Sequence, residues 1–155
     1  MLNAMPINQR PITQKAIAAG AKKIIAIGGD GTINEVASVL TNTEIPLGII
    51  PLGSGNGLAR HLKIPMQVEK AYHVALNGNP IRIDVGSING KRFFCTAGIG
   101  FDATVANAFA KGEKRGLFNY ITATLSSLIK YKSIQVSINE GPWEQVFSLT
   151  IANAN

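Results

Sequence analysis

Two short apolar segments of this chain are each followed by a glycine-rich turn, and this repeat limits the folds open to it. The segment 24–27 runs into GGDGT at 28–32, and the segment 45–50 runs into LGSGN at 52–56. After each turn, apolar residues recur at helical spacing. They are Ile33, Val36, Ala37 and Leu40 after the first turn, and Val68, Ala71, Tyr72, Ala75 and Leu76 after the second. Consecutive strand-turn-helix units predict an α/β domain in which parallel strands carry helices on their faces.

The pattern changes after residue 79. Ile81, Ile83 and Val85 alternate with polar residues or glycine, which predicts a half-exposed strand. SINGKRFF at 87–94 contains Asn-Gly, a strong hairpin signal, and 117–128 has helical spacing. A second hairpin is expected beyond it, with Ile134, Val136 and Ile138 opposite Phe147, Leu149 and Ile151. Strands joined by hairpins predict the start of an antiparallel β-sandwich with a helical insert.

Neither end of the chain completes this architecture. A two-strand parallel sheet is thin for an α/β domain, and the last alternating strand stops at IANAN. We therefore expect the chain to be a fragment of a larger protein, or to cover exposed strand edges by self-association.

The composition excludes several classes of protein. Of 155 residues, 46% are hydrophobic and 15% charged, which is typical of a globular chain. No apolar run approaches the roughly 20 residues that span a bilayer, and the start lacks the order of a secretory signal. Cys95 is the single cysteine, which excludes an internal disulfide, and we expect a cytoplasmic protein.

The charge of the chain favours anionic partners. Fifteen Lys and Arg residues against nine Asp and Glu give a net charge of +6, which suits nucleotides or acidic lipid headgroups. The basic residues are scattered and lack interleaved aromatic residues, so we expect no nucleic-acid partner. His61 and His73 do not have the spacing of metal ligands.

The two glycine turns follow parallel strands, at the sheet edge where α/β proteins bind ligands. Backbone N–H groups and the helix dipole attract phosphate there. A carboxylate among phosphates suits a ligand of Mg²⁺ or a base that accepts a proton, which makes Asp30 the candidate residue. The alternative is that Asp30 caps the helix that follows it.

GGDGTINEVASVL and IPLGIIPLGSGNGLARHLKIP together resemble the diacylglycerol kinase catalytic-domain family, which includes bacterial lipid kinases and sphingosine kinases. The resemblance continues through IDVGSINGKRFFCTAGIGFDATVA and YITATLSSLIKYKSIQVSI, and it covers the chain from about residue 15 onward. Phosphofructokinases and NAD kinases share a GGDG turn, but the GSGN loop and the GIGFDA segment are typical of the lipid kinases.

The resemblance implies an ATP-dependent lipid kinase of phospholipid metabolism that uses Mg²⁺. The acceptor would be the hydroxyl of a diacylglycerol- or sphingosine-like lipid, reached by peripheral contact with an anionic membrane. It implies a phosphofructokinase-like nucleotide-binding domain over 1–79, without its first strand, and a partial β-rich lipid-substrate domain over 80–155. Because much of the second domain is missing, we expect this chain alone to be an inactive fragment.

The resemblance also assigns site residues. Asp30 is the expected catalytic residue, Asp30 and Asp84 are expected to hold metal, and Phe101 and Asp102 are expected beside the lipid acceptor. The expected nucleotide contacts are Gly28, Gly29, Asp30, Gly31, Thr32, Glu35, Gly53, Ser54, Gly55, Asn56 and Arg60. The alternatives are structural: a solvated helix residue for Glu35, cover of the helix surface for Arg60, and a helix N-cap for Asp102.

Gly57 departs from the pattern of bacterial diacylglycerol kinases, which commonly carry aspartate after the loop asparagine. Sphingosine-kinase-like members have a small residue there, so the departure removes one carboxylate and bears on which lipid is the substrate. Two other functions stay open: a soluble-substrate kinase of the NAD kinase or phosphofructokinase type, and a nucleotide-binding module without catalysis.

Overall fold

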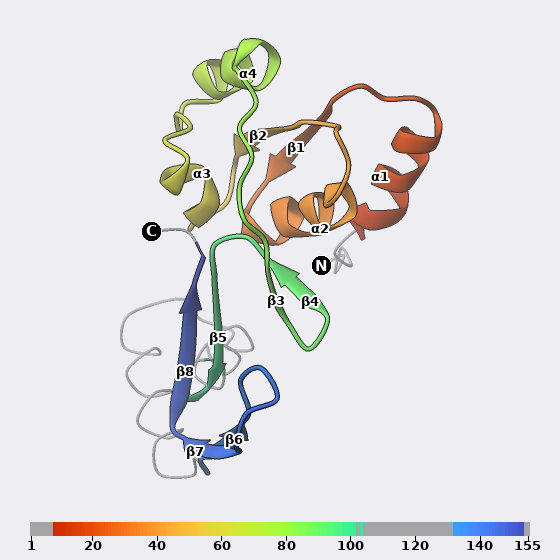
Figure 1. Ribbon diagram of the computed structural model, residues 1–155. Coiled ribbons are helices and arrows are strands. Elements are labelled where there is room, and N and C mark those ends of the chain that lie inside the picture. Colours follow the sequence, from red (N-terminus) through yellow and green to blue (C-terminus); the bar gives the residue numbers. More distant parts are fainter. Residues whose placement is uncertain (1–7, 102, 104–131, 154–155) are drawn as a thin grey trace, which may run out of the picture. The chain divides into compact units, whose positions relative to one another are not determined.

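The computed structural model describes residues 8–101, 103 and 132–153 (Figure 1). The chain forms two compact units, the first from Met1–Cys95 with Asn153–Asn155 and the second from Thr96–Ala152. These compact units divide after Cys95, whereas the sequence pattern predicts a domain boundary after residue 79. A compact unit need not be a domain, so the expected boundary stays a prediction.

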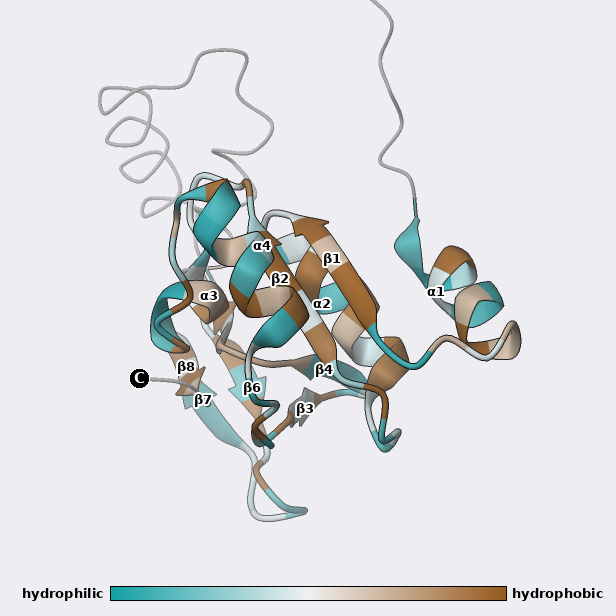
Figure 2. Cartoon of the chain, turned by 90° about the horizontal axis from the view of Figure 1, so that it is seen from above, coloured by the Kyte–Doolittle hydropathy of each residue, from teal (hydrophilic) through white to brown (hydrophobic). Residues whose placement is uncertain are grey.

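The first unit is built on two parallel strands. Strands β1 (Ile24–Gly28) and β2 (Leu47–Pro51) pair along their whole length, and their last residues, Gly28 and Pro51, are partners. Helix α2 (Asp30–Leu40) connects them, as the first strand-turn-helix pattern predicts. Both strands are apolar, which suits a parallel sheet covered by helices (Figure 2). The predicted α/β fold and parallel pairing are therefore confirmed.

Helix α2 covers one face of this sheet. Its four predicted core residues, Ile33, Val36, Ala37 and Leu40, are all buried and belong to one cluster with Ala26 and Ile49 of the strands. Helix α1 (Gln9–Ala18) packs in turn on α2. The helical spacing read from the sequence thus identifies the buried face of α2 correctly.

Helix α4 (Val68–Asn77) packs on the other face, against β2. Its buried residues are Ala71 and Ala75, whereas Tyr72 and Leu76, expected on the packed face, are 53% and 41% exposed. The helix approaches the strand closely, because a Cβ atom at Gly48 would lie 2.9 Å from the Ala75 Cβ atom. Only small residues fit at that distance, so the buried stripe is narrower than the hydrophobic pattern predicts.

The strand expected at 81–85 was a wrong prediction. Residues 79–85 form neither helix nor strand, and Ile81 is 69% exposed. A strand requires a hydrogen-bonded partner, and none pairs with this segment in the part of the chain that the structure describes.

The predicted Asn-Gly hairpin is confirmed. Strands β3 (Gly86–Ile88) and β4 (Lys91–Phe93) are antiparallel, and Asn89 and Gly90 between them have φ angles of 48° and 74°. Two consecutive positive φ angles are those of a type I′ turn. Arg92 fastens the hairpin to α2 by donating from Nη1 to the Ser38 carbonyl oxygen at 2.6 Å.

The described part of the second unit consists of two antiparallel strand pairs. Strand β5 (Thr96–Gly100) pairs with β8 (Ser148–Ala152), and β6 (Ile134–Val136) pairs with β7 (Glu144–Val146). The predicted helix at 117–128 lies outside the described residues. A β-sandwich therefore stays a prediction, and antiparallel pairing is what this unit shows.

The pairing expected for the second hairpin was wrong in its partners. Ile134 lies opposite Val146, while Leu149 and Ile151 lie opposite Ile99 and Ala97 of β5. The residues after Trp143 form two strands, β7 and β8, which belong to different strand pairs. Only β7 pairs with β6 as the expected hairpin requires, whereas β8 pairs with β5. Alternation along a strand indicates its buried face and carries no information on its partner.

Candidate nucleotide-binding site

The first glycine turn lies at the carboxyl end of β1. Strand β1 ends at Gly28, Gly29 is the N-cap of α2, and Asp30 is the first helical residue. The amides of Asp30, Gly31 and Thr32 are in the first helical turn, where N–H groups have no acceptor within the helix. They form the positive end of an eleven-residue helix, an arrangement that attracts phosphate.

The second glycine loop follows β2 and lies against the first turn. The Leu52 N–H donates to the Gly28 carbonyl oxygen at 2.9 Å, and a Cβ atom at Gly53 would lie only 2.5 Å from the Gly29 Cα atom. Helix α3 (Gly57–His61) begins directly after the loop. The two glycine-rich segments thus meet at the carboxyl ends of neighbouring parallel strands.

Asn56 fixes the shape of the second loop. It is buried, has left-handed backbone angles (φ 56°, ψ 42°), and exchanges two hydrogen bonds with Gly53. Its Oδ1 atom accepts from the Gly53 N–H at 2.9 Å, and its Nδ2 atom donates to the Gly53 carbonyl oxygen at 2.7 Å. Asparagine tolerates the left-handed region better than most residues. Asn56 therefore orders the loop, and the nucleotide contact expected of it from the sequence stays a prediction.

The Asp30 side chain lies beside the second loop. A Cβ atom at Gly55 would lie 2.8 Å from Asp30 Oδ2, and one at Gly57 would lie 3.8 Å from Asp30 Oδ1. Gly29 is the N-cap of α2 and the helix has no side-chain capping bond, so Asp30 does not cap it. Asp30 is thus an exposed carboxylate beside both glycine loops, and its role as metal ligand or base stays a prediction.

Three further predicted residues border the same loops. Ser54 is exposed on the second loop, and Arg60 is exposed on α3 with its Nε atom donating to the Gly55 carbonyl oxygen at 2.9 Å. Thr32 packs on Gly28, where a Cβ atom would lie 2.9 Å from the Thr32 Oγ1 atom. The guanidinium of Arg60 is thereby held at the second glycine loop.

Glu35 contacts the first residue of α1. Its Oε2 atom accepts a hydrogen bond from the N–H of Gln9, the first residue of α1, at 2.8 Å. A carboxylate at a helix N-terminus stabilises that helix through its dipole and its unpaired N–H groups. In the structure Glu35 joins α1 to α2. The sequence indicates a nucleotide contact or a solvated helix residue for Glu35, and it does not predict this contact.

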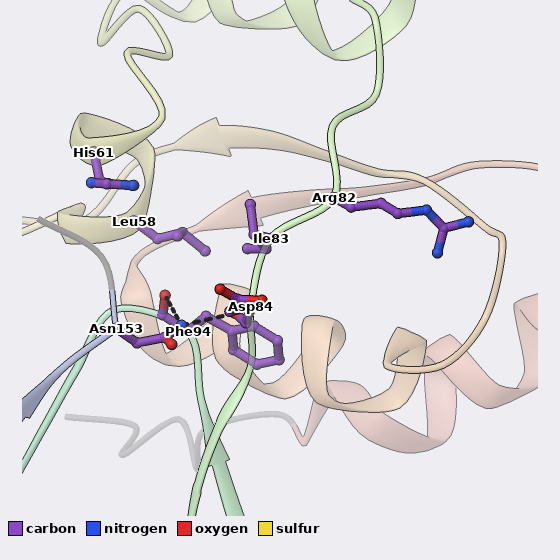
Figure 3. Close-up of a pocket in the computed structure, with 7 residues that line it drawn as sticks. All are labelled: Leu58, His61, Arg82, Ile83, Asp84, Phe94 and Asn153. Carbon is purple, nitrogen blue, oxygen red and sulfur yellow. Dashed lines mark hydrogen bonds between the residues drawn. The ribbon is translucent and has the colours of Figure 1, made fainter.

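Asp84 lines a cavity of about 290 Å³ together with residues of α3 and the chain around β4 (Figure 3). The lining residues are Leu58, His61, Arg82, Ile83, Asp84, Phe94 and Asn153. Arg82 extends away from the others and pairs with Glu44 at 2.7 Å on the surface. No group of three or more His, Cys, Asp or Glu side chains converges within the described residues. Asp30 and Asp84 are thus not brought into such a cluster there.

The residues expected beside the lipid belong to the second unit. Phe101 is buried and stacks on Phe147 with ring centroids 4.7 Å apart, and its N–H donates to the Phe147 carbonyl oxygen at 3.1 Å. Asp102 lies outside the described residues. Of the predicted site, the structure therefore brings together the two glycine loops, Asp30 and Arg60.

Two contacts at this site were not predicted from the sequence. Cys95 contacts the residue that follows the second loop, since a Cβ atom at Gly57 would be 3.3 Å from the Cys95 Sγ atom. Asn153 donates to the carbonyl oxygens of Asp84 and Phe94. Both contacts join segments distant in sequence, and no local pattern marks them.

Three comparisons with known proteins bear on this chain. The diacylglycerol kinase catalytic domain, as a family, matches residues 4–88. A Chromohalobacter salexigens protein named "Probable lipid kinase YegS-like" is 39% identical over 108 residues, which cover 67% of this chain and 35% of that protein. A protein of the same name from Yersinia enterocolitica is 41% identical over 90 residues, 56% of this chain and 30% of that protein.

Solved structures agree on the fold. The crystal structure of a diacylglycerol kinase from Bacillus anthracis superposes with a TM-score of 0.62 at 24% identity. The superposition covers 94% of this chain and 50% of the other. This chain thus spans about half the length of the solved relative, and its matches span about a third of the curated ones. No helix among the described residues is long and apolar enough to cross a membrane.

Proposed function

The chain belongs to the diacylglycerol kinase catalytic-domain family, and we propose that its two glycine loops bind ATP for phosphoryl transfer to a lipid hydroxyl. The observation that carries the proposal is the contact of Gly29 with Gly53, which joins two phosphate-binding elements beside one carboxylate. The acceptor is a diacylglycerol- or sphingosine-like lipid on an anionic membrane, a surface that suits the net charge of +6.

Different residues of the first unit have different roles in nucleotide binding. First-turn amides of α2 and the main chain of the second loop hold phosphate oxygens, since N–H groups at a helix N-terminus attract anions and glycine permits close approach of the main chain. Arg60, fixed to the Gly55 carbonyl oxygen, adds a positive charge at the loop. Asn56 keeps the loop in the shape that admits phosphate.

Asp30 fits the role of a Mg²⁺ ligand. Mg²⁺ is usually held by one or two carboxylates together with substrate phosphates, so a single exposed carboxylate beside two phosphate loops suffices. When bound, the ion neutralises the charge of the phosphates during transfer. Asp84 is a second proposed metal residue, whose carboxylate is free to act through water. Asp30 also lies where a base could accept the proton of the attacking hydroxyl.

Binding is tested with the chain itself by titrating ATP in the presence and absence of Mg²⁺ by calorimetry. Gly55→Val places its side chain against Asp30 Oδ2 and across the loop, so nucleotide binding should be lost while circular dichroism stays unchanged. Unaltered affinity in this variant would show that phosphate does not approach the second loop.

Transfer is tested separately with radiolabelled ATP and a lipid acceptor in mixed micelles. Labelled lipid supports the proposed kinase. Labelled soluble acceptors such as NAD or a sugar phosphate would favour a soluble-substrate kinase, and binding without any transfer would favour a nucleotide-binding module. The same assay on a longer relative of the family separates a property of the fold from a property of this chain.

A further inference from the structure

Asn153 makes three hydrogen bonds to main-chain atoms of segments far from it in sequence, and Figure 3 shows the two that its side chain makes. Its N–H donates to the Cys95 carbonyl oxygen at 2.7 Å, and its Nδ2 atom donates to Asp84 at 2.8 Å and to Phe94 at 3.4 Å. The Asp84 and Phe94 carbonyl oxygens are therefore joined by one amide group. This holds the segment before β3 against the segment after β4.

The segment that Asn153 holds, residues 94–95, contacts the end of the second glycine loop at Gly57. Cys95 packs on Gly57, because a Cβ atom at Gly57 would lie 3.3 Å from the Cys95 Sγ atom. The same Cβ atom would lie 3.8 Å from Asp30 Oδ1, so Gly57 separates the thiol from the carboxylate. Leu58, the next residue of α3, lines the cavity with Asp84 and Phe94. The main chain at residues 94–95 and the end of the loop are therefore in contact through Cys95 and Gly57.

We propose that Asn153 is a positioning residue of the nucleotide site, which sets the main chain at Asp84 and Cys95 and through Cys95 supports the second glycine loop. The inference rests on the proposed function for its link to ATP. The amide is suited to this role because its two N–H donors face two carbonyl oxygens. An aspartate of the same shape has no such donor when ionised, and its charge would repel those oxygens.

The test uses Asn153→Asp in the 155-residue chain, with Asn153→Ala as a second variant that removes the donor without adding charge. We measure the rate at which Cys95, the only thiol, reacts with a disulfide reagent, and the ¹⁵N resonances of Gly55 and Gly57. Both variants should expose Cys95 to faster reaction and shift both glycine resonances. The dissociation constant for ATP with Mg²⁺ should rise by up to about tenfold, the order expected when a hydrogen bond that supports the site is lost.

Lys23→Met is the matched control for a general loss of stability. The Lys23 Nζ atom donates to the Ala75 and Leu76 carbonyl oxygens at 3.1 and 2.6 Å, at the end of α4. This variant should lower the melting temperature while leaving the Cys95 rate, the glycine resonances and the ATP affinity unchanged.

Two results would overturn the proposal: an unchanged Cys95 rate with unchanged glycine resonances in both Asn153 variants, or the same changes in Lys23→Met. The Cys95 and resonance measurements require no nucleotide. If the wild-type chain bound no ATP, the proposed function would fail, and these two readouts would still decide whether Asn153 positions the loop.

Discussion

Gly29 and Gly53 are in direct main-chain contact, although they belong to different strand-turn-helix segments. A Cβ atom at Gly53 would lie 2.5 Å from the Gly29 Cα atom, and one at Gly29 would lie 3.1 Å from the Gly53 Cα atom. The packing of one loop on the other therefore requires glycine at residue 53 and leaves little room for a side chain at residue 29. The same packing brings the two loops together at the carboxyl ends of β1 and β2, the edge of the sheet where we propose that phosphate binds.

We expect Gly53→Ala to lower both stability and nucleotide affinity. The added methyl group meets the Gly29 Cα atom and the Asn56 Oδ1 atom, at 2.5 and 2.8 Å, so the main chain must move apart. Overpacking of this kind costs about 1–3 kcal/mol. Chemical denaturation measures the loss of stability, and calorimetry measures the loss of ATP affinity.

Gly31→Ala is the stability control for that variant. A Cβ atom at Gly31 meets no heavy atom within 4 Å, and alanine favours a helix by up to about 1 kcal/mol over glycine. Its free energy of unfolding should be equal or higher. Equal stability of Gly53→Ala and the wild type would mean that the loops are not in contact in solution.

The Asn56 side chain should contribute to stability in two separable ways. Asn56→Gly keeps the left-handed backbone accessible but removes the two hydrogen bonds with Gly53, a loss of about 1–3 kcal/mol. Asn56→Ala removes the same bonds and also pays about 1–2 kcal/mol for the left-handed conformation. Denaturation should therefore rank wild type above the glycine variant and the glycine variant above the alanine variant. The reverse order of the two variants would show that the backbone of residue 56 is not left-handed.

The elements that local patterns determine were predictable from the sequence. Strand β1, helix α2 and the Asn89–Gly90 turn depend on residues close in sequence, and the structure has all three where the pattern placed them. The meeting of the glycine loops followed from the rule that parallel strands end at the same edge. That rule needs only the order of the elements.

The errors concern contacts between distant segments. The alternation at 81–85 is the pattern of a strand, but pairing depends on a partner that the segment does not have among the described residues. Leu149 pairs with Ile99 across a long separation, and a strand pattern is compatible with either partner. Glu35 contacts Gln9 because α1 packs on α2, and the face of α2 that receives α1 cannot be read from α2 alone.

Asp30→Asn should remove the effect of Mg²⁺ on nucleotide binding while keeping ATP affinity without metal within about tenfold, or 1.4 kcal/mol. The substitution keeps the shape of the side chain and removes only its charge. Because Gly29 and not Asp30 is the N-cap of α2, stability should fall by no more than about 0.3–1 kcal/mol, the value of a charge near a helix N-terminus. Calorimetry with and without Mg²⁺ gives the two affinities. An unchanged Mg²⁺ effect in this variant would exclude Asp30 as the metal ligand.

Two roles are considered for Glu35, contact with the nucleotide and attachment of α1 to α2, and a substitution distinguishes them. The hydrogen bond from the Gln9 N–H to Glu35 Oε2 favours attachment, so Glu35→Ala should loosen α1. We expect faster hydrogen exchange confined to Gln9–Ala18, a loss of stability of about 1 kcal/mol, and unchanged ATP affinity. Glu35→Gln keeps an acceptor oxygen at the same position and should retain most of the protection of α1. Protected α1 amides together with weakened ATP binding in Glu35→Ala would reverse this assignment and place Glu35 at the nucleotide.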